Sequence, residues 1–99
     1  LPTRVEIDTD TSDKATIVLV FSRDRPGLLY TITWTLFKLD LSIDLARIST
    51  HFDQVVDVFY VTDNEGQKIS SSEDCQTIQD RILRELAKFE QSTHRDFVS

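Results

Sequence analysis

Residues 15–29 have the sequence ATIVLVFSRDRPGLL, which takes the chain from a strand into a helix. Residues 15–21 form an almost unbroken run of β-branched, aliphatic and aromatic side chains, too short for an independent helix and typical of a central strand. Pro26 fixes φ at a value that suits the first helical position, so we expect a helix to begin there and to end near Asp40. Its predicted buried face consists of Leu28, Leu29, Ile32, Leu36 and Leu39.

The segment before this run predicts a hairpin. Residues 4–8 alternate polar and apolar side chains, as a strand with one buried face does. Residues 9–14 are rich in the Asp, Ser and Thr that form turns. We therefore expect the first strand to fold back antiparallel on the strand at 15–21.

A second hairpin is predicted further along the chain. Residues 43–52 and 55–62 are both strand-like, with a tight connection at Asp53-Gln54. Both faces of the later strand are mostly apolar, with Val56, Val58 and Tyr60 on one and Asp57, Phe59 and Val61 on the other. A four-stranded sheet with helices on one side leaves a face or an edge uncovered, so we expect self-association or a neighbouring domain.

The first helix has a second apolar stripe, formed by Tyr30, Trp34 and Phe37. At about 100° per residue this stripe lies opposite the buried face, and a helix on a sheet cannot bury both within one domain. Two interpretations remain open. The flank of the stripe contacts the second helix, or Trp34 and its neighbours anchor a partner.

The second helix is the strongest helix signal. Residues 63–66 predict a turn, and Ser70 with Glu73 or Ser71 with Asp74 predicts an N-terminal capping box. Its apolar face comprises Cys75, Ile78, Ile82, Leu86 and Phe89, and its outer face has i,i+4 pairs of Asp80 with Arg84 and Arg81 with Glu85. The pattern fades after Gln91, so we expect a single domain over residues 1–91 and a tail, or the start of a following segment, over 92–99.

Composition excludes several classes of function. The 99 residues have a formal net charge of -6 and no basic cluster, which disfavours nucleic acid and an anionic membrane surface. One cysteine excludes an internal disulfide, and no apolar run approaches the roughly 20 residues that span a bilayer. We expect a cytoplasmic location. Because the chain contains no methionine, it is interpreted as a piece of a longer protein.

Catalytic and metal-binding motifs are absent from the sequence. His51, His94 and Cys75 have no metal-ligand spacing, and no Gly-rich phosphate loop or nucleophile elbow occurs. We predict no catalytic residue, no metal and no cofactor. The turn at residues 22–29 remains, because unpaired amides at a helix start suit a carboxylate and Gly27 permits close approach. On the residues alone, a simple helix start is the favoured interpretation.

A family resemblance changes that balance. The chain resembles the ACT domains, and more narrowly the C-terminal ACT domains of bifunctional uridylyltransferase/uridylyl-removing enzymes, which modify the PII signal protein. Plant proteins built of repeated ACT domains share much of the pattern. The resemblance extends over roughly residues 4 to 90 and rests on Asp24-Arg25-Pro26-Gly27-Leu28-Leu29, Leu41-Ser42-Ile43, Ala46-Arg47-Ile48-Ser49-Thr50 and Val56-Asp57-Val58-Phe59-Tyr60-Val61-Thr62-Asp63.

The resemblance implies an α+β, ferredoxin-like fold with a four-stranded antiparallel sheet and two helices on one face. The strand at residues 4–8 would take the edge position. ACT domains commonly pair and bind amino acids near the pair interface, which implies ligand-binding residues Asp24, Arg25, Pro26, Gly27, Leu28, Ser42 and Ile43. The family often has Asn where Ser42 stands, and serine reaches less far.

Two functional hypotheses follow. The first is a regulatory module that binds an amino acid, with glutamine expected, and changes how it packs on a second ACT domain, in cis or in a homodimer. The parent would then be a nucleotidyltransferase with an HD phosphohydrolase domain. The alternative is a ligand-free docking module, with Tyr30, Trp34 and Phe37 in its interface.

Overall fold

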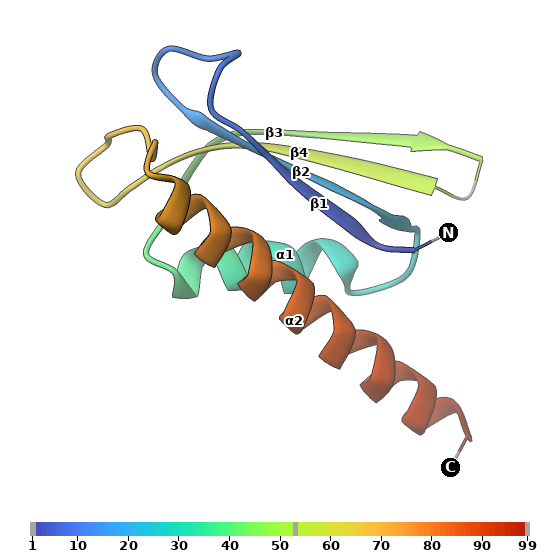
Figure 1. The fold of residues 1–99 in the computed structure, drawn as a ribbon. Coiled ribbons are helices and arrows are strands. Elements are labelled where there is room, and N and C mark those ends of the chain that lie inside the picture. The colour runs from blue at the N-terminus through green and yellow to red at the C-terminus, as the bar shows by residue number, and fades with distance from the viewer. Residues whose placement is uncertain (1, 53, 99) are drawn as a thin grey trace.

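The sheet has the strand order β1-β2-β4-β3, and every neighbouring pair is antiparallel. The computed structural model describes residues 2–52 and 54–98, with side-chain surroundings as far as residue 91. Both helices cover the same face of the sheet (Figure 1). The elements are β1 (Arg4–Asp8), β2 (Thr16–Arg23), α1 (Leu28–Lys38), β3 (Ser42–His51), β4 (Gln54–Thr62) and α2 (Ser72–Val98). The predicted ferredoxin-like fold with the N-terminal strand at an edge is confirmed.

The core lies between the sheet and the two helices. β4 alternates between buried and half-buried side chains, and the buried set of Val55, Asp57, Phe59 and Val61 faces the helices. β2 lies between β1 and β4, paired with β4 along its whole length and with β1 over residues 17–21, as its apolar sequence predicts. The core is completed by Val5, Val18, Val20, Leu28, Ile32, Leu36, Ile69, Ile78, Ile82 and Leu86.

Helix α1 begins two residues later than the sequence predicts. Pro26 precedes the helix, and Gly27 is its N-cap with a left-handed backbone, φ +85°. At the other end, Asp40 is also left-handed, with φ +64°. The Leu41 N–H donates to the Leu36 carbonyl at 3.1 Å and the Asp40 N–H to the Phe37 carbonyl at 2.9 Å, which is a Schellman motif.

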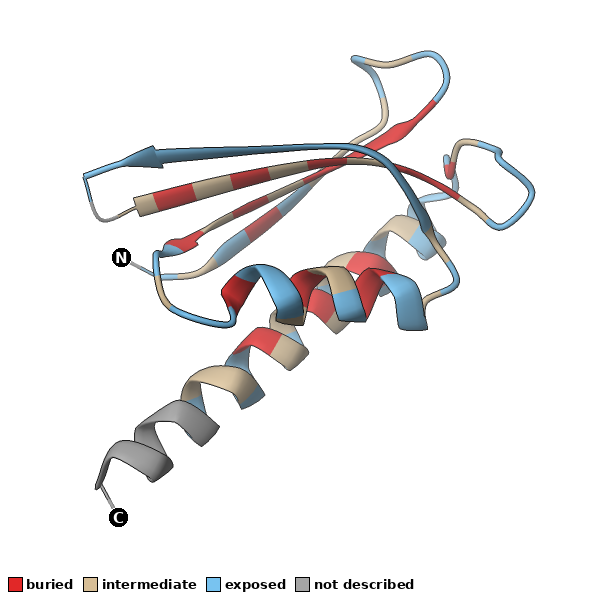
Figure 2. Ribbon diagram, turned by 180° about the vertical axis from the view of Figure 1, so that it is seen from behind, coloured by how far each residue is buried: buried red, intermediate tan, exposed pale blue. Residues whose placement is uncertain are grey.

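The predicted buried face of α1 is correct except at its start. Leu28, Ile32 and Leu36 are buried, and Leu39 packs partly against the core. Leu29 is 42% exposed, so its assignment to that face was wrong. The physical reason is that Leu29 borders the open groove between α1 and β3, and β3 is exposed along its whole length (Figure 2), so this side of the helix meets solvent.

β3 is exposed along its whole length. Each residue from Ser42 to His51 is exposed, although the strand is paired with β4 except at a register shift between Ile43 and Leu45. Its outer edge has no strand neighbour in the sheet. Strand β3 begins and ends one residue earlier than predicted, and Asp53 of the predicted Asp53-Gln54 connection lies outside the described residues.

Helix α2 uses the second of the two predicted caps. The Ser71 hydroxyl accepts the Asp74 N–H at 3.1 Å, and the Arg81–Glu85 pair forms at 3.3 Å. The expected Asp80–Arg84 pair is not present among the described residues, because Asp80 instead accepts a hydrogen bond of 2.8 Å from the Gln76 amide. The helix runs past Gln91 to Val98. No helix in the described part of the chain is long and apolar enough to cross a membrane.

Candidate ligand groove

A groove of about 280 Å³ lies where β2 turns into α1 and where α1 faces the uncovered strand β3. It is lined by Asp24, Arg25, Gly27, Leu28, Leu29, Tyr30, Ile48, Thr50, Val55 and Asp57. The turn and the first residues of α1 form one wall, and β3 and β4 supply the other residues. The volume is near the lower end of the range for small-molecule sites, which suits a metabolite of amino-acid size.

The start of α1 presents unpaired backbone donors to this groove. Gly27 offers no side-chain cap. The Leu28 N–H donates to the Arg25 carbonyl at 3.3 Å, and the Thr31 N–H donates to the Gly27 carbonyl at 3.0 Å. The amides of Leu29 and Tyr30 have no acceptor among the described residues. Unsatisfied N–H groups and the positive end of the helix dipole together favour an anion such as a carboxylate.

Asp57 is the most unusual side chain in the groove. It is 1% exposed, and neither carboxylate oxygen has a hydrogen-bond partner in the described structure. Burial, and then the nearby charge of Asp24, raise the pKa of Asp57 to about 6. Buried polar groups are nearly always hydrogen-bonded, so an unpartnered carboxylate calls for an explanation.

Gly27 makes close contact with helix α2. A Cβ atom at this position would lie 3.1 Å from Cε1 of Phe89, and the positive φ is itself unfavourable for other residues. The missing side chain therefore admits Phe89. The sequence predicts close approach of a ligand or a neighbouring backbone at Gly27, whereas the group that approaches it in the structure is the Phe89 side chain.

The structure brings only part of the predicted ligand site together. Asp24, Arg25, Gly27 and Leu28 line the groove, whereas Pro26 does not. Ser42 and Ile43 pair with Thr62 and Val61 at the far end of β4 from Val55. Within one chain these two residues do not reach the groove.

The predicted interface residues lie on the solvent side of α1. Tyr30 is 71% exposed, Trp34 40% and Phe37 74%. The Lys38 ammonium lies 5.4 Å from the centre of the Trp34 ring. The exposure of these three side chains leaves an apolar surface open to a partner, and it does not decide whether the flank of the stripe contacts α2.

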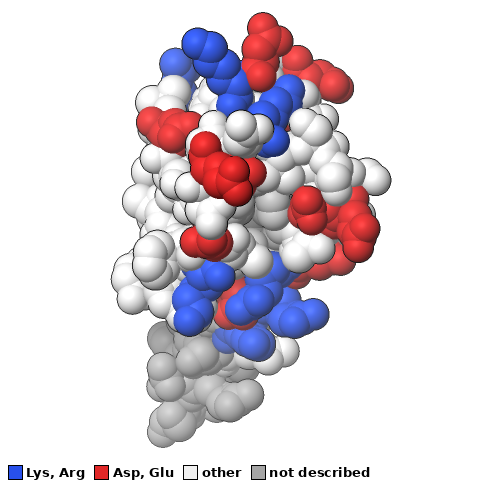
Figure 3. Space-filling view, turned by 90° about the vertical axis from the view of Figure 1, so that its left-hand side faces the viewer, with Lys and Arg blue, Asp and Glu red and all other residues white. Residues whose placement is uncertain are grey.

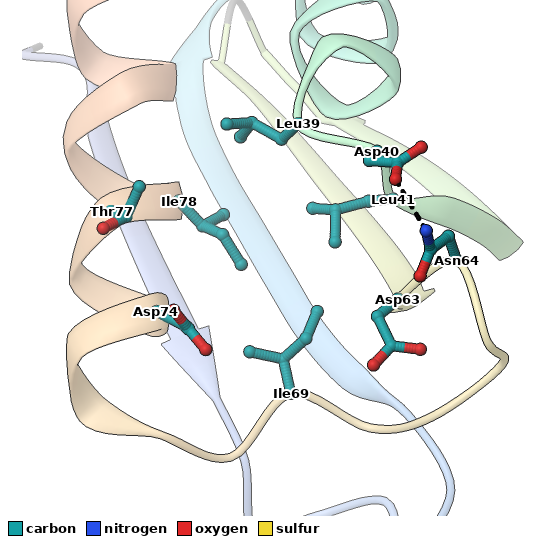
Figure 4. Close-up of a pocket in the computed structure, with 9 residues that line it drawn as sticks. All are labelled: Leu39, Asp40, Leu41, Asp63, Asn64, Ile69, Asp74, Thr77 and Ile78. Atoms are coloured by element: carbon teal, nitrogen blue, oxygen red, sulfur yellow. Dashed lines mark hydrogen bonds between the residues drawn. The ribbon is translucent and has the colours of Figure 1, made fainter.

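A second hollow, of about 270 Å³, lies near the opposite end of α1 (Figure 4). Leucine and isoleucine side chains occupy its centre, with acidic groups around them. Asp40 already accepts from the Asn64 amide at 2.8 Å, and Asp63 accepts from the Glu65 and Gln67 amides, each at 2.9 Å. We assign no site to it.

Other potentially reactive groups give no sign of chemistry. Cys75 is half-buried, and burial raises the pKa of its thiol, as expected for an inert core cysteine. His51 is exposed at the end of β3. In residues 2–52 and 54–91 no three metal-binding side chains form a group able to hold an ion. Acidic and basic side chains are interspersed on the end of the molecule seen in Figure 3.

The fold agrees with a comparison against known families. The family model for the ACR family N-terminal ACT domain matches residues 11–88. The chain is a member of the ACT-domain family. In this ACT domain β1 takes the edge position beside β2, and the groove lies at the turn that contains Asp24-Arg25-Pro26-Gly27-Leu28.

Curated relatives of the ACT domain include bacterial enzymes. A bifunctional uridylyltransferase/uridylyl-removing enzyme from Azospirillum brasilense is 44% identical over 88% of this chain. Proteins of the same name from Stutzerimonas stutzeri and Gluconobacter oxydans are 39% and 41% identical over 86% and 87% of it. The chain spans 9% of the length of each of these relatives. No solved structure matches it.

Sequence reasoning missed several residues of the groove. The sequence places Leu29, Ile48, Thr50 and Val55 only in strands and on a helix face, and Asp57 only on one of the two mostly apolar faces of its strand. A signal for Asp57 was present, because a single acid alternates there with Phe59 and Val61 on a face that is otherwise apolar. The width of the gap between α1 and β3 left no such signal.

Proposed function

We propose that this ACT domain is a regulatory module that binds an amino acid in the groove at the start of α1. The observation that supports it is the combination of free α1 amides with a groove of about 280 Å³ at the turn where the family resemblance places the ligand. Glutamine is the expected ligand. The domain would serve a cytoplasmic uridylyltransferase/uridylyl-removing enzyme with an HD phosphohydrolase domain, in which it is one of the C-terminal ACT domains.

The proposed partner is a second ACT domain, either in the same chain or in a homodimer. β3 offers an unpaired edge, and Ile43, Leu45 and Ile48 on it are exposed. Pairing two such edges satisfies backbone groups and covers the apolar side chains. The exposed stripe of Tyr30, Trp34 and Phe37 lies on the helix beside β3 and would be covered in the same step.

This pairing also accounts for the separated site residues. If two β3 strands pair antiparallel, Ser42 and Ile43 of one copy approach the end of the other β3 that holds Ile48 and Thr50. Ile48 and Thr50 line the groove. The groove of each copy would then be completed by the start of its neighbour's β3.

Titration calorimetry tests whether the domain binds an amino acid and which one. We expect saturable heat with L-glutamine, or with one other standard L-amino acid, at concentrations where the chain is a dimer. Leu29→Glu should abolish it, because a carboxylate introduced beside the free α1 amides competes with that of the ligand. Thr33→Glu, one turn further along the same helix, is the matched control.

A ligand-free docking module is the second candidate, and the exposed stripe on α1 favours it. Trp34→Ala should weaken dimerisation by about 2 kcal/mol if Trp34 is a central anchor. Arg84→Ala removes a large exposed side chain from α2 and should leave the dimer unchanged. If the chain forms a stable dimer that binds no amino acid, the sensor hypothesis is wrong and the docking module becomes the favoured function.

A further inference from the structure

Asp57 has no role in the fold that explains its burial. Its neighbours across the sheet are Val20 on β2 and Ile48 on β3, both apolar. Its two oxygens have no partner within the described residues. An uncompensated carboxylate in such surroundings destabilises the fold, so its presence calls for a partner of opposite charge.

The groove contains one cationic side chain, Arg25, and one further acid, Asp24. Arg25 forms no ion pair with Asp57 in the structure. Asp24 has the same sign of charge as Asp57 and does not compensate it. A cation that pairs with Asp57 must therefore come from outside the described residues or from a movement of Arg25.

The opposite wall of the groove has the opposite electrostatic character. The Leu29 and Tyr30 amides at the start of α1 are free donors that favour a carboxylate. A buried acceptor and free donors thus border one cavity of about 280 Å³. A ligand with a carboxylate and an ammonium group on adjacent positions matches both at once.

We propose that Asp57 is the ammonium-binding residue of the groove and that it selects α-amino acids over carboxylic acids without an amino group. The ligand carboxylate would lie at the Leu29 and Tyr30 amides, its ammonium at Asp57, and its side chain against Ile48 and Thr50. This proposal rests on the proposed function of the same groove. It adds the residue that recognises the amino group.

Asp57→Asn tests the proposal, because it keeps the shape of the side chain and removes its charge. We expect its affinity for L-glutamine to fall by about tenfold or more, since a hydrogen bond to a charged group is lost. Asp13→Asn removes the same charge from the exposed loop before β2 and should bind as the wild type does. Glutaramic acid, which is glutamine without its α-amino group, should give no heat with the wild type.

Thermal melting without ligand gives a readout independent of binding. At pH 7.5 we expect Asp57→Asn to melt at a higher temperature than the wild type, because it no longer buries an unpaired charge. If it melts lower, Asp57 has an internal partner in solution, such as Arg25, and the proposal is wrong.

The binding outcomes separate the two proposals. If Asp57→Asn binds glutamine as tightly as the wild type, or if glutaramic acid binds as tightly as glutamine, the role of Asp57 is overturned and the amino-acid sensor stands. If a different standard L-amino acid proves to be the ligand, the same two tests use that amino acid in place of glutamine and its analogue without the α-amino group in place of glutaramic acid. If none binds to the wild-type dimer, the sensor and the role of Asp57 fail together.

Discussion

At the scale of single residues, the buried charge of Asp57 should make stability depend on pH. Its folded pKa of about 6 lies above the ordinary aspartate value of 3.8, so the folded state binds the proton more tightly than the unfolded chain does. The wild type therefore loses stability as the pH rises from about 4 to about 6. Asp57→Asn should be more stable at pH 7.5 by about 1–3 kcal/mol.

Urea unfolding at two pH values checks this sign. The gain in unfolding free energy from Asp57→Asn should be present at pH 7.5, should be much smaller near pH 4, and should vanish below about pH 3, where the aspartate is protonated in both states. If the gain in unfolding free energy were equal at both pH values, the charge of Asp57 would not be its cause.

Gly27 and Gly66 form a natural pair for measuring the contact between the α1 N-terminus and α2. Both have positive φ, +85° and +78°, but a Cβ would meet Phe89 at 3.1 Å in the first and nothing within 4 Å in the second. Gly66→Ala should cost about 1–2 kcal/mol from the left-handed backbone alone. Gly27→Ala should cost clearly more in urea unfolding, and equal costs would mean that Phe89 moves aside freely.

Residue-level features of the site were only partly predictable. The turn motif placed Asp24, Arg25, Gly27 and Leu28 in the groove because they are contiguous in sequence. Asp57 comes from a strand far along the chain, and its missing partner is a property of three-dimensional packing. No pattern of neighbouring residues reports whether a buried acid is satisfied.

At the scale of elements, the N-terminus of α2 offers a test of capping. The Ser71 hydroxyl accepts the Asp74 amide, whereas Ser70 makes no side-chain hydrogen bond in the described structure. Ser71→Ala should lower the free energy of unfolding by about 1 kcal/mol, and Ser70→Ala should change it by less than about 0.5 kcal/mol. Equal effects in urea unfolding would show that either serine can cap the helix.

The elements themselves were predictable where one local signal dominates. The apolar run at residues 15–21 and the stripe through Ile78, Ile82 and Leu86 lie in β2 and α2 as expected. The start of α1 was misplaced because Pro26 suits a first helical position, whereas the left-handed Gly27 delays the helix. Leu29 was misassigned because helical spacing does not reveal which part of a sheet a helix leaves uncovered.

At the scale of the whole molecule, ligand binding and pairing should be coupled. If Ser42 and Ile43 of a second copy complete the groove, an amino acid binds the dimer more tightly than the monomer. Reciprocity then requires that the ligand strengthen the dimer by the same factor. Analytical ultracentrifugation with and without saturating L-glutamine should show a lower dimer dissociation constant with the ligand.

A dimer constant that does not change with ligand would place the whole binding site within one copy. In that case Ser42→Ala should also leave the affinity for glutamine unchanged. The dimer dissociation constant and the glutamine affinity of Ser42→Ala therefore both test whether a second copy completes the groove.

The sequence alone did not predict how the two parts of the proposed site are arranged in space. Ser42-Ile43 and the turn at Asp24–Leu28 were grouped by family resemblance alone. The register of β3 against β4 places them at opposite ends of the sheet. In the proposed pairing a second copy brings them together, and one sequence does not contain that relation.

Because strand β3 is fully exposed, hydrogen–deuterium exchange of its backbone amides would report whether its free edge is paired with another chain or domain. Amide hydrogens on the free edge of a sheet exchange with deuterium far faster than those bonded on both sides. In an isolated copy, the outward-facing amides between Ser42 and His51 would become labelled early. In a longer protein that contains this domain, slow labelling of the same peptide would show that a partner is hydrogen-bonded to this edge.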